Sequence, residues 1–439
     1  MEIYEEYMDS GIDWIGAIPI EWELRRIKTL LLAHQGGAWG DEPAEDENDR
    51  ICIRVADFNF DHLSVYNEEY TVRNYTTAQI EKLSLNYGDI LVEKSGGGEK
   101  YPVGRVVMFA ERFPALFANF LEVFRPNLDN VNSRFLGYSL ASAYHNELTR
   151  KYYNQTTGIQ NLNVTGYICE KVAVPTINEQ NLIVSYLDNR TAQLDFLISN
   201  LEKQAEMLDI YKRELIAEVV TKGLDKSTPM KDSGVDWIGS VPEHWKVTKI
   251  KWMFEIVKRI YGKEDREVLS ITQNGIKIKD IELNEGQLAE SYANYQVVNV
   301  NDFAMNSMDL LTGWVDCSPY EGVTSPDYRV FRFLPSKPQC HSYYKYLFQI
   351  CYKNRIFYRL GQGVSNFGRW RLQADQFLNM RFPQPPIEEQ ERIANYLDAK
   401  TAKVGGLIAD ITEQIEKLKE YRKIVIHDAV TGKIKVTEG

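Results

Sequence analysis

The chain of 439 residues is 44% hydrophobic and 26% charged, and its net charge of −11 gives no overall attraction for nucleic acid. This length predicts two domains with connecting segments rather than one compact core. No apolar run approaches the roughly 18–20 residues that cross a bilayer, the N-terminus lacks a signal-peptide pattern, and the five cysteines form no C-x-x-C pair. These features predict a cytoplasmic protein with no membrane partner and argue against a metal site.

The chain opens on a motif that it repeats later. DSGIDWIG at Asp9–Gly16 returns as DSGVDWIG at Asp232–Gly239, and a proline and a tryptophan follow each copy, at an offset of 223 residues. A second motif closes each copy at an offset of 210: EQ at 179–180 and 389–390, YLD at 186–188 and 396–398, and TA at 191–192 and 401–402. The middles therefore differ in length by 223 − 210 = 13 residues. This pattern predicts two equivalent modules with different variable surfaces on one scaffold, which suits a bipartite, asymmetric target.

The first module, residues 1–175, has mixed α/β patterning. Strand-like alternation is found at Gly88–Val92, Val103–Phe109 and Phe120–Phe124, followed by a helical pattern over about Ser133–Lys151 and a polar loop at Gln155–Asn163. A glycine-rich segment, KSGGGEK at Lys94–Lys100, lets the backbone approach a phosphate, but a flexible turn is an equal interpretation. With 16 basic and 26 acidic residues, this module has a net charge of −10.

After Pro175 a heptad pattern predicts a long helix over about Asn178–Lys222, and the pattern returns at the end of the chain. The predicted seam consists of Leu187, Leu194, Leu201, Leu208 and Leu215, with Leu397, Val404, Ile411, Leu418 and Val425 in the second copy. The companion seam holds Arg190 and Gln204 in one copy and Lys400 and Gln414 in the other. A parallel pair would place Arg190 against Lys400, so we expect an antiparallel coiled coil. The glutamines either set its register or belong to the seam without further meaning.

The second module, residues 230–385, has the same order of elements and the opposite charge. Strand patterns at Val297–Met305 and Tyr328–Phe333 precede a helical pattern at Ser342–Leu360 and a polar loop at Gly361–Arg371. It has 20 basic and 17 acidic residues, a net of +3, and from Tyr328 to Ala374 it has nine basic residues and no acidic one. Such a run favours phosphate contact. The alternative is that its aromatic residues form core and its basic residues a solvated face.

The loops and the residues before them have the chemistry that base reading needs, because Asn and Gln pair with adenine and Arg with guanine. In the first module the candidate DNA-binding residues are Lys94, Lys100, Arg150, Lys151, Gln155, Thr156, Thr157, Gln160, Asn161 and Asn163. In the second they are Lys345, Lys353, Arg355, Arg359, Gln362, Ser365, Asn366, Arg369 and Arg371. Arg355 and Arg359 are four residues apart, so a helix would place them on one face as a phosphate clamp.

The doubled DSGxDWIGxxPxxW opening and the EQxxIxxYLDxxTA helix start resemble the specificity subunit of type I restriction-modification systems, over nearly the whole chain. The resemblance implies two target-recognition domains that each read half of a split DNA site, and helices that act as a ruler. It also implies two methyltransferase subunits that use S-adenosylmethionine and restriction subunits that use ATP and Mg²⁺ as partners. Only the repeated motifs carry over residue by residue, as scaffold and partner-binding positions.

The expected fold is α/β, with recognition domains at 1–175 and 230–385, a helix and linker at 176–229, and a second helix at 386–439. No amino-methyltransferase or Walker motif is present in the sequence, and the six histidines form no ligand pattern, so no catalysis or cofactor is expected in this chain. The alternative hypothesis is a coiled-coil adaptor that binds protein or RNA without DNA specificity. The recognised bases and the spacer length do not follow from the sequence.

Overall fold

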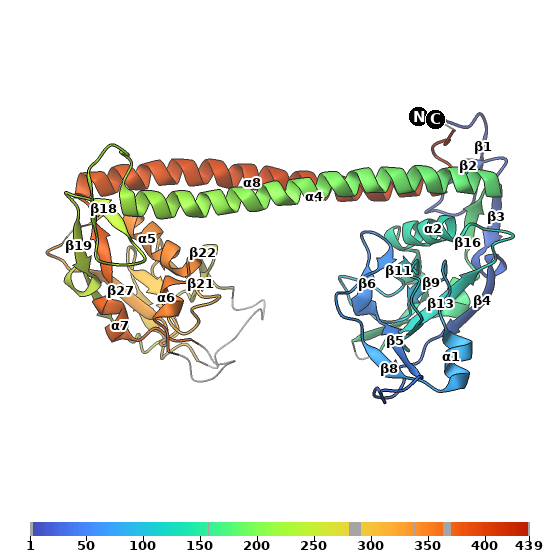
Figure 1. Cartoon of the computed structure of the whole chain (residues 1–439), viewed down its shortest axis with the longest axis horizontal. Coiled ribbons are helices and arrows are strands. Elements are labelled where there is room, and N and C mark those ends of the chain that lie inside the picture. Colours follow the sequence, from blue (N-terminus) through green and yellow to red (C-terminus); the bar gives the residue numbers. More distant parts are fainter. Residues whose placement is uncertain (1–2, 157, 281–290, 338, 363–369, 438–439) are drawn as a thin grey trace. The chain divides into compact units, whose positions relative to one another are not determined.

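The structure is a computed structural model that describes residues 3–156, 158–280, 291–337, 339–362 and 370–437. The chain divides into two compact units (Figure 1): unit 1 comprises Met1–Leu201 with Glu413–Gly439, and unit 2 comprises Glu202–Thr412. Two long helices, α4 (Ile177–Lys222) and α8 (Ile387–Val430), each contribute to both units. The helix predicted over about 178–222 is thus confirmed. These units divide the chain differently from the predicted domain boundaries, which separate the modules from the helices.

In unit 1, module 1 consists of short strands and short helices, of which α2 is the longest. In chain order its elements before α4 are β1 (Tyr7–Asp9), β2 (Ala17–Pro19), β3 (Glu23–Arg26), η1 (Ile27–Leu30), β4 (Leu31–Gly36), β5 (Asp49–Ile53), η2 (Val55–Asp57), β6 (Phe58–Asn59), β7 (Ser64–Val65), β8 (Val72–Asn74), α1 (Thr77–Leu83), β9 (Ile90–Glu93), β10 (Ser95–Gly96), β11 (Val106–Met108), β12 (Ala115–Phe117), β13 (Leu121–Pro126), α2 (Ser133–His145), η3 (Leu148–Tyr152), β14 (Tyr153–Thr156), β15 (Ile159–Leu162), α3 (Val164–Tyr167) and β16 (Lys171–Val174). The main sheet has the order β4-β13-β9-β11-β7-β6, and α2 contacts β11. One core lies between this sheet, α2 and the long helices, and a second core lies around β5 and β12.

Unit 2 repeats the plan with a different middle. Its elements between the long helices are β17 (Met230–Asp232), β18 (Ser240–Pro242), β19 (Lys246–Lys249), η4 (Ile250–Trp252), β20 (Phe254–Val257), β21 (Leu269–Thr272), β22 (Gly275–Ile278), β23 (Gln296–Val298), β24 (Phe303–Met305), β25 (Val315–Cys317), β26 (Gly322–Thr324), β27 (Arg329–Phe333), α5 (His341–Lys353), α6 (Ile356–Arg359), α7 (Ala374–Asn379) and β28 (Arg381–Gln384). The sheet order β20-β27-β24-β25 places aromatic side chains, among them Phe254, Phe303 and Phe331, against Tyr344 and Phe348 of α5. The interpretation of the aromatics as core is confirmed.

The repeated motif forms the same structure in both units. β1 pairs with β2 antiparallel and β17 with β18 likewise, in the same register from Tyr7↔Pro19 and Met230↔Pro242. Between the strands the aspartate side chain of each DSG accepts the backbone N–H of its glycine, at 2.9 Å in Asp9 and 3.0 Å in Asp232. Gly11 and Gly234 have φ values of +66° and +67°, which glycine adopts without strain. The motif is therefore a turn whose residue types are set by its backbone.

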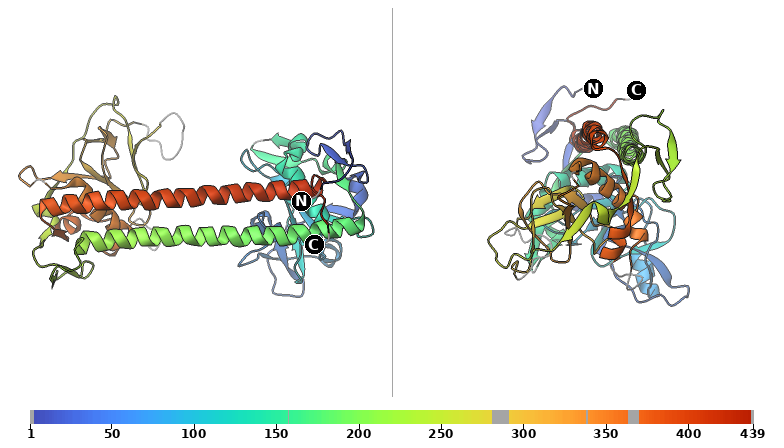
Figure 2. Two further views of the ribbon diagram at one scale, coloured as in Figure 1. Left: turned by 90° about the horizontal axis from the view of Figure 1, so that it is seen from above. Right: turned by 90° about the vertical axis from the view of Figure 1, so that its left-hand side faces the viewer.

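The two long helices run in opposite directions within each unit (Figure 2). In unit 1, Leu187 near the start of α4 shares a core with Val425 near the end of α8. In unit 2, Val220 at the end of α4 shares a core with Ile393 and Leu397 at the start of α8. The Arg190 guanidinium lies 5.6 Å from the Tyr421 ring, and its Nη2 donates to the Tyr421 hydroxyl at 3.3 Å, so it does not face Lys400. The antiparallel direction is confirmed in each unit.

The predicted leucine seam is buried or half-buried along its length, whereas its companion is buried at Ile183 and Ile393 and exposed in the middle. Leu187, Leu194, Leu397, Val404 and Val425 are buried, while Leu201, Leu208, Leu215, Ile411 and Leu418 are half-buried. In the companion seam, Gln204 and Gln414 are exposed, as are Leu197 and Leu407. The hypothesis that the glutamines set the register is therefore not supported, because an exposed amide can satisfy its hydrogen bonds with water.

Candidate nucleic-acid interface

Each repeated tryptophan links its module to the first turn of the long helix that follows that module in the chain. The Trp22 indole N–H donates to Glu179 at 3.2 Å, and the Trp245 indole N–H donates to Glu389 at 3.0 Å. Both indoles are only 1% exposed. A buried indole needs an acceptor, which explains why the opening motif and the EQ motif occur together in each copy.

The glutamine that follows each of these glutamates holds the module's helix. Gln180 Oε1 accepts the backbone N–H of Asn132 at 2.7 Å, immediately before α2, and Gln390 Oε1 accepts that of Cys340 at 3.0 Å, immediately before α5. The aspartate of each YLD then accepts a tyrosine hydroxyl from the same helix: Tyr138 donates to Asp188 at 2.7 Å, and Tyr346 donates to Asp398 at 2.5 Å. The repeated motifs are thus scaffold positions that orient α2 and α5 on the long helices.

Each opening motif also receives the end of the other long helix. Gly432, just after α8, lies against Pro19 and Trp22, where a Cβ atom would come within 2.4 Å of Pro19 Cδ. Gly223, just after α4, lies against Trp245 in unit 2. Both glycines have positive φ, +72° and +78°, as helix C-caps commonly do. Each copy of the opening motif, with the tryptophan that follows it, therefore contacts the start of one long helix and the end of the other.

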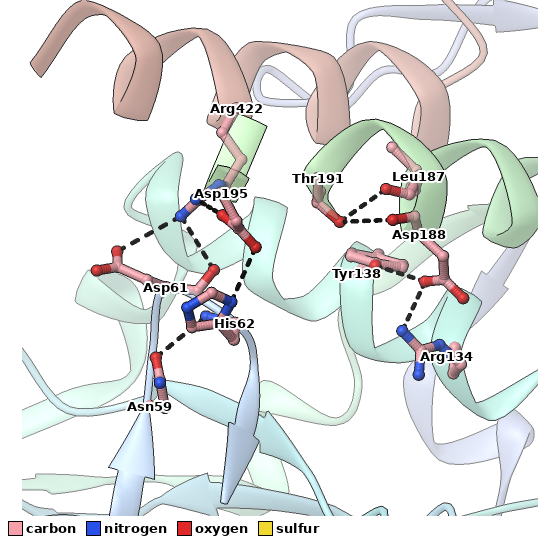
Figure 3. Close-up of polar contacts among 10 residues, drawn as sticks. All are labelled: Asn59, Asp61, His62, Arg134, Tyr138, Leu187, Asp188, Thr191, Asp195 and Arg422. Carbon is pink, nitrogen blue, oxygen red and sulfur yellow. Dashed lines mark hydrogen bonds and ion pairs between the residues drawn. The ribbon is translucent and has the colours of Figure 1, made fainter. Parts of the chain in front are cut away.

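An ionic cluster strengthens this attachment in unit 1 (Figure 3). Arg422 of α8 forms an ion pair with Asp195 of α4, and its guanidinium donates to the backbone carbonyl oxygen of Asp61 in module 1 at 3.1 Å. Asp195 also contacts His62 Nδ1 at 2.8 Å. Nearby, Arg134 of α2 pairs with Asp188 at 2.6 Å. The Arg422 side chain is only 8% exposed, so it depends on these partners for its charge.

Unit 2 has no such cluster among the residues that the structure describes. The 210-residue offset places Lys212 where unit 1 has Arg422 and Gly405 where it has Asp195. Lys212 has no ion pair in the described part of unit 2, and it lines a small pocket of about 260 Å³ with Asp316 and Lys345. Burial raises the pKa of Asp316. The charges that anchor module 1 are therefore not reproduced in unit 2.

The predicted polar loop of module 1 is a β-hairpin. β14 and β15 pair from Tyr153↔Leu162 to Thr156↔Ile159, and β15 also pairs with β10. Along β15 the side chains alternate: Ile159 and Asn161 are exposed, whereas Gln160 and Leu162 are buried. The loop interpretation is corrected, because Gln155–Asn163 contains the second half of β14 and all of β15.

Burial contradicts the prediction that Gln160 contacts a base. Its side chain is 1% exposed and accepts the backbone N–H of Val103 at 3.2 Å. A Cβ atom on Gly97 would lie 2.9 Å from Gln160 Oε1 and 2.7 Å from the Val103 nitrogen. The glycine-rich segment therefore makes room for this buried amide, which favours the turn interpretation of Lys94–Lys100 over a phosphate loop.

The other polar candidates of module 1 have different surroundings. Asn161 is exposed, and its Oδ1 accepts the Ser95 hydroxyl at 2.6 Å. Asn163 caps α3 by accepting the backbone N–H of Gly166 at 3.0 Å, and Gln155 is exposed on β14. Asn154, which the sequence analysis missed, is exposed and directly opposite Asn161. Thr157 and the Thr156 side chain lie outside the described part of the chain.

The basic candidates of module 1 are mostly compensated by acids. Lys94 pairs with Glu122 at 3.1 Å, and Arg150 pairs with Glu147 at 3.0 Å. Lys100 and Lys151 are exposed, and Lys100 lies 5.2 Å from the Tyr101 ring. Lys100 and Lys151 are therefore the two basic candidates of module 1 that have no ion pair among the residues that the structure describes.

Module 2 offers more uncompensated charge, but the predicted clamp is wrong. Arg355 is not on a helical face: its φ is +55°, and it precedes the short helix α6, which holds Arg359. Arg355, Arg359 and Arg371 are nevertheless exposed, with no ion pair among the described residues. Gln362 is exposed and bridges to Arg371 through backbone hydrogen bonds of 3.0 and 3.2 Å. Three arginines of the acid-free sequence are thus exposed to solvent.

Three further basic side chains of module 2 contact other residues of the chain. Lys345 lies 5.1 Å from the Tyr346 ring, and Lys353 is 3.9 Å from Asp209. Arg329 is buried, donates to the Leu372 carbonyl oxygen at 2.7 Å, and has a pKa lowered to about 10 by burial. Arg329 is therefore a structural member of the acid-free run. Ser365, Asn366 and Arg369 lie outside the described residues.

The described residues contain no group of three or more His, Cys, Asp or Glu side chains placed to hold a metal ion. In the same part of the chain, no helix has the length and apolar character to cross a membrane.

Known proteins with related sequences match nearly the whole chain. The family described as "Type I restriction modification DNA specificity domain" matches residues 19–207 and 242–417. The chain is 24% identical over 436 residues to the "Putative type I restriction enzyme MjaX specificity subunit" of Methanocaldococcus jannaschii, covering 96% of each protein. It is 22% identical over 438 residues to the "Type I restriction enzyme MjaVIII specificity subunit" of the same organism, covering 95% of this chain and 94% of that protein.

A solved structure has the same fold. It is described as "Structural basis underlying complex assembly and conformational transition of the type I R-M system" and superposes with a TM-score of 0.67 at 13% identity, covering 95% of this chain and 99% of that one. The family match covers most of both modules and the first part of each long helix, including Trp22, Trp245 and the EQ and YLD motifs. The chain therefore belongs to the family of type I restriction-modification DNA specificity subunits.

Proposed function

We propose that each module reads one half of a bipartite, asymmetric DNA site and that the long helices keep the two readers in register. The observation that carries this proposal is the combination of equal anchoring with unequal surfaces. Both modules are fastened by the same tryptophan, glutamine and tyrosine hydrogen bonds, whereas their polar surfaces differ in residue type and in charge compensation. Two different readers held in one way would recognise two different half-sites.

The helices are proposed to form an antiparallel coiled coil that acts as the ruler. A helix of 46 residues such as α4 is about 69 Å long at ~1.5 Å per residue. Half-sites on one face of B-DNA lie about 34–36 Å apart for one helical turn. Helices of this length are therefore sufficient to span the half-sites and to leave surface for protein partners.

Two methyltransferase subunits are the proposed partners of the scaffold, with restriction subunits bound to the complex. Large apolar side chains on the helices support this assignment, because Phe196, Met207 and Ile424 are 68%, 62% and 54% exposed. In this proposal the chain contributes recognition in the cytoplasm. S-adenosylmethionine, ATP and Mg²⁺ would act on the partner subunits.

Selection from a random DNA library tests this function directly. The full chain, bound to its methyltransferase partner, is expected to enrich two short sequences separated by a spacer of fixed length and variable composition. Binding should weaken steeply with salt, because phosphate contacts release counterions. If no sequence is enriched and binding hardly depends on salt, the adaptor hypothesis replaces this proposal.

A further inference from the structure

The hairpin of module 1 presents a face whose chemistry suits an A·T base pair. Asn154 on β14 and Asn161 on β15 are direct cross-strand partners, so their side chains leave the same face of the hairpin. Ile159 lies on that face too and is 49% exposed. An asparagine amide can pair with adenine, and an apolar side chain can contact the thymine methyl group.

Folding stability alone does not account for these side chains. The opposite face of β15 supplies the core contact through Leu162 and the buried Gln160 amide. Asn154 and Asn161 face solvent, and an exposed asparagine on a strand adds little to stability because its residue type disfavours strands. β14 is also the edge of the three-stranded sheet β10-β15-β14, and a two-stranded ribbon fits the major groove of B-DNA.

Ser95 holds one of the two amides. Its hydroxyl donates to Asn161 Oδ1 at 2.6 Å from β10, where it is the cross-strand partner of Asn161. A carbonyl oxygen accepts two hydrogen bonds, so the second acceptor site of Oδ1 and the whole Nδ2 group remain for a ligand. This contact holds the Asn161 side chain in place on the exposed face of the hairpin.

We propose that Asn154 and Asn161 are specificity-determining residues that read A·T base pairs in the major groove, with Ser95 as the positioning residue for Asn161. This inference rests on the proposed function and adds which element of module 1 reads and which base pair it takes. Exposed Lys100 and Lys151 belong to the same module and are free of ion pairs in the described part of the chain, which suits the neighbouring phosphates.

Library selection with the full chain and its methyltransferase partner tests the proposal. The wild-type protein is expected to select A·T pairs within one half-site. Asn154→Ala and Asn161→Ala should each reduce the preference at one of those positions by about tenfold or more, and leave the other half-site unchanged. Asn161→Asp should move the preference toward cytosine, whose exocyclic amine donates to a carboxylate. Ser95→Ala should relax the same position as Asn161→Ala, to a smaller degree.

Asn86→Ala is the matched control, because Asn86 is an asparagine of module 1 outside the hairpin. It should select the wild-type sequence, and unfolding midpoints should be equal for all these variants. If the hairpin variants keep the wild-type half-site, or weaken binding to every sequence alike, the inference is wrong while the proposed function stands. If the wild-type protein itself selects no sequence, the proposed function fails instead.

Discussion

The two units attach their modules by the same hydrogen bonds and differ in the charges placed around them. Trp22 and Trp245 donate to equivalent glutamates, and α2 and α5 are held by equivalent glutamines and aspartates. Among the described residues, unit 1 alone adds a cluster such as that of Arg422. Conversely, Arg355, Arg359 and Arg371 of module 2 are exposed without an ion pair in the described part of the chain, whereas module 1 pairs Lys94 and Arg150 with glutamates.

This difference separates two tasks within one duplicated plan. The shared hydrogen bonds recur because both modules must meet the helices in the same way. Charged residues can differ between the two units where they would face a ligand or where they strengthen the attachment of one module only. We therefore expect variants at matched positions to act alike when they remove a shared hydrogen bond and unlike when they remove a charge.

The largest difference is expected between Arg422→Ala and Lys212→Ala. Replacing the buried Arg422 breaks its ion pair with the largely buried Asp195, which should cost about 3–5 kcal/mol in unit 1. Lys212 has no ion pair in the described residues, so its removal should cost about 0–1 kcal/mol in unit 2. Hydrogen exchange measures the stability of each unit separately. Equal costs in both units would show that the cluster does not anchor module 1.

Gln180→Leu and Gln390→Leu should destabilise their own units equally. Each change leaves a backbone N–H without its acceptor, at Asn132 or at Cys340, which costs about 1–3 kcal/mol. The measurement is again hydrogen exchange of α2 and α5 in the two variants. A large effect in one unit alone would contradict the structural equivalence of the two motifs.

Module 2 should contribute more to DNA affinity than module 1. Replacing Arg355 and Arg359 with alanine should weaken binding to all sequences and reduce the slope of log affinity against log salt by up to about 1.8, at ~0.9 for each phosphate that is no longer neutralised. The same change at Lys94 and Arg150, which are paired with acids, should reduce the slope by less. Salt titrations of nonspecific DNA binding measure these slopes. Equal slopes for the two double variants would contradict the predicted difference in DNA affinity between the modules.

The smallest expected difference is the pH effect of His427, a histidine of unit 1 that unit 2 lacks at the matched position. Burial lowers the pKa of His427, whose ring contacts Ser142 at 3.1 Å, and the offset of 210 places Ala217 at that position in unit 2. The unfolded chain then binds more protons than the folded unit below about pH 6.5. The stability of unit 1 should therefore fall as the pH drops through about 6.5, and His427→Gln should reduce this dependence. The remaining part comes from His145, because burial lowers the pKa of His145 to about 4. A profile that is unchanged in the variant would assign the effect to other groups.

Periodicity and repetition predicted the parts of the fold that rest on local pattern. The heptad leucines placed α4 within one residue of its start, and the clash of Arg190 with Lys400 indicated the helix direction. The companion seam failed at Gln204 and Gln414 because the pairing of two helices covers one stripe more fully than the other. The break at Arg355 was invisible because helical spacing continues on both sides of a single residue with positive φ.

The candidate site was harder to predict because its order comes from distant residues. Asn161 and Gln160 are adjacent in sequence, and only the pairing of β15 with the distant Ser95 and Gly96 decides which of them is exposed. Because of the same pairing, Gly97 of the glycine-rich segment leaves room for the buried Gln160 side chain. Amide-rich composition therefore indicated the segment that forms the hairpin, and it could not tell the exposed face of the hairpin from its buried face.

The central claim is that each module reads one half-site independently. Single-molecule sequencing of DNA from cells that express the methyltransferase partner with either this chain or the Asn154→Ala/Asn161→Ala variant tests it most directly. The claim predicts a methylated bipartite motif for the wild-type chain, and for the variant a motif with one half relaxed and the other half and the spacer unchanged. A single undivided motif, or a variant that alters both halves together, would contradict it.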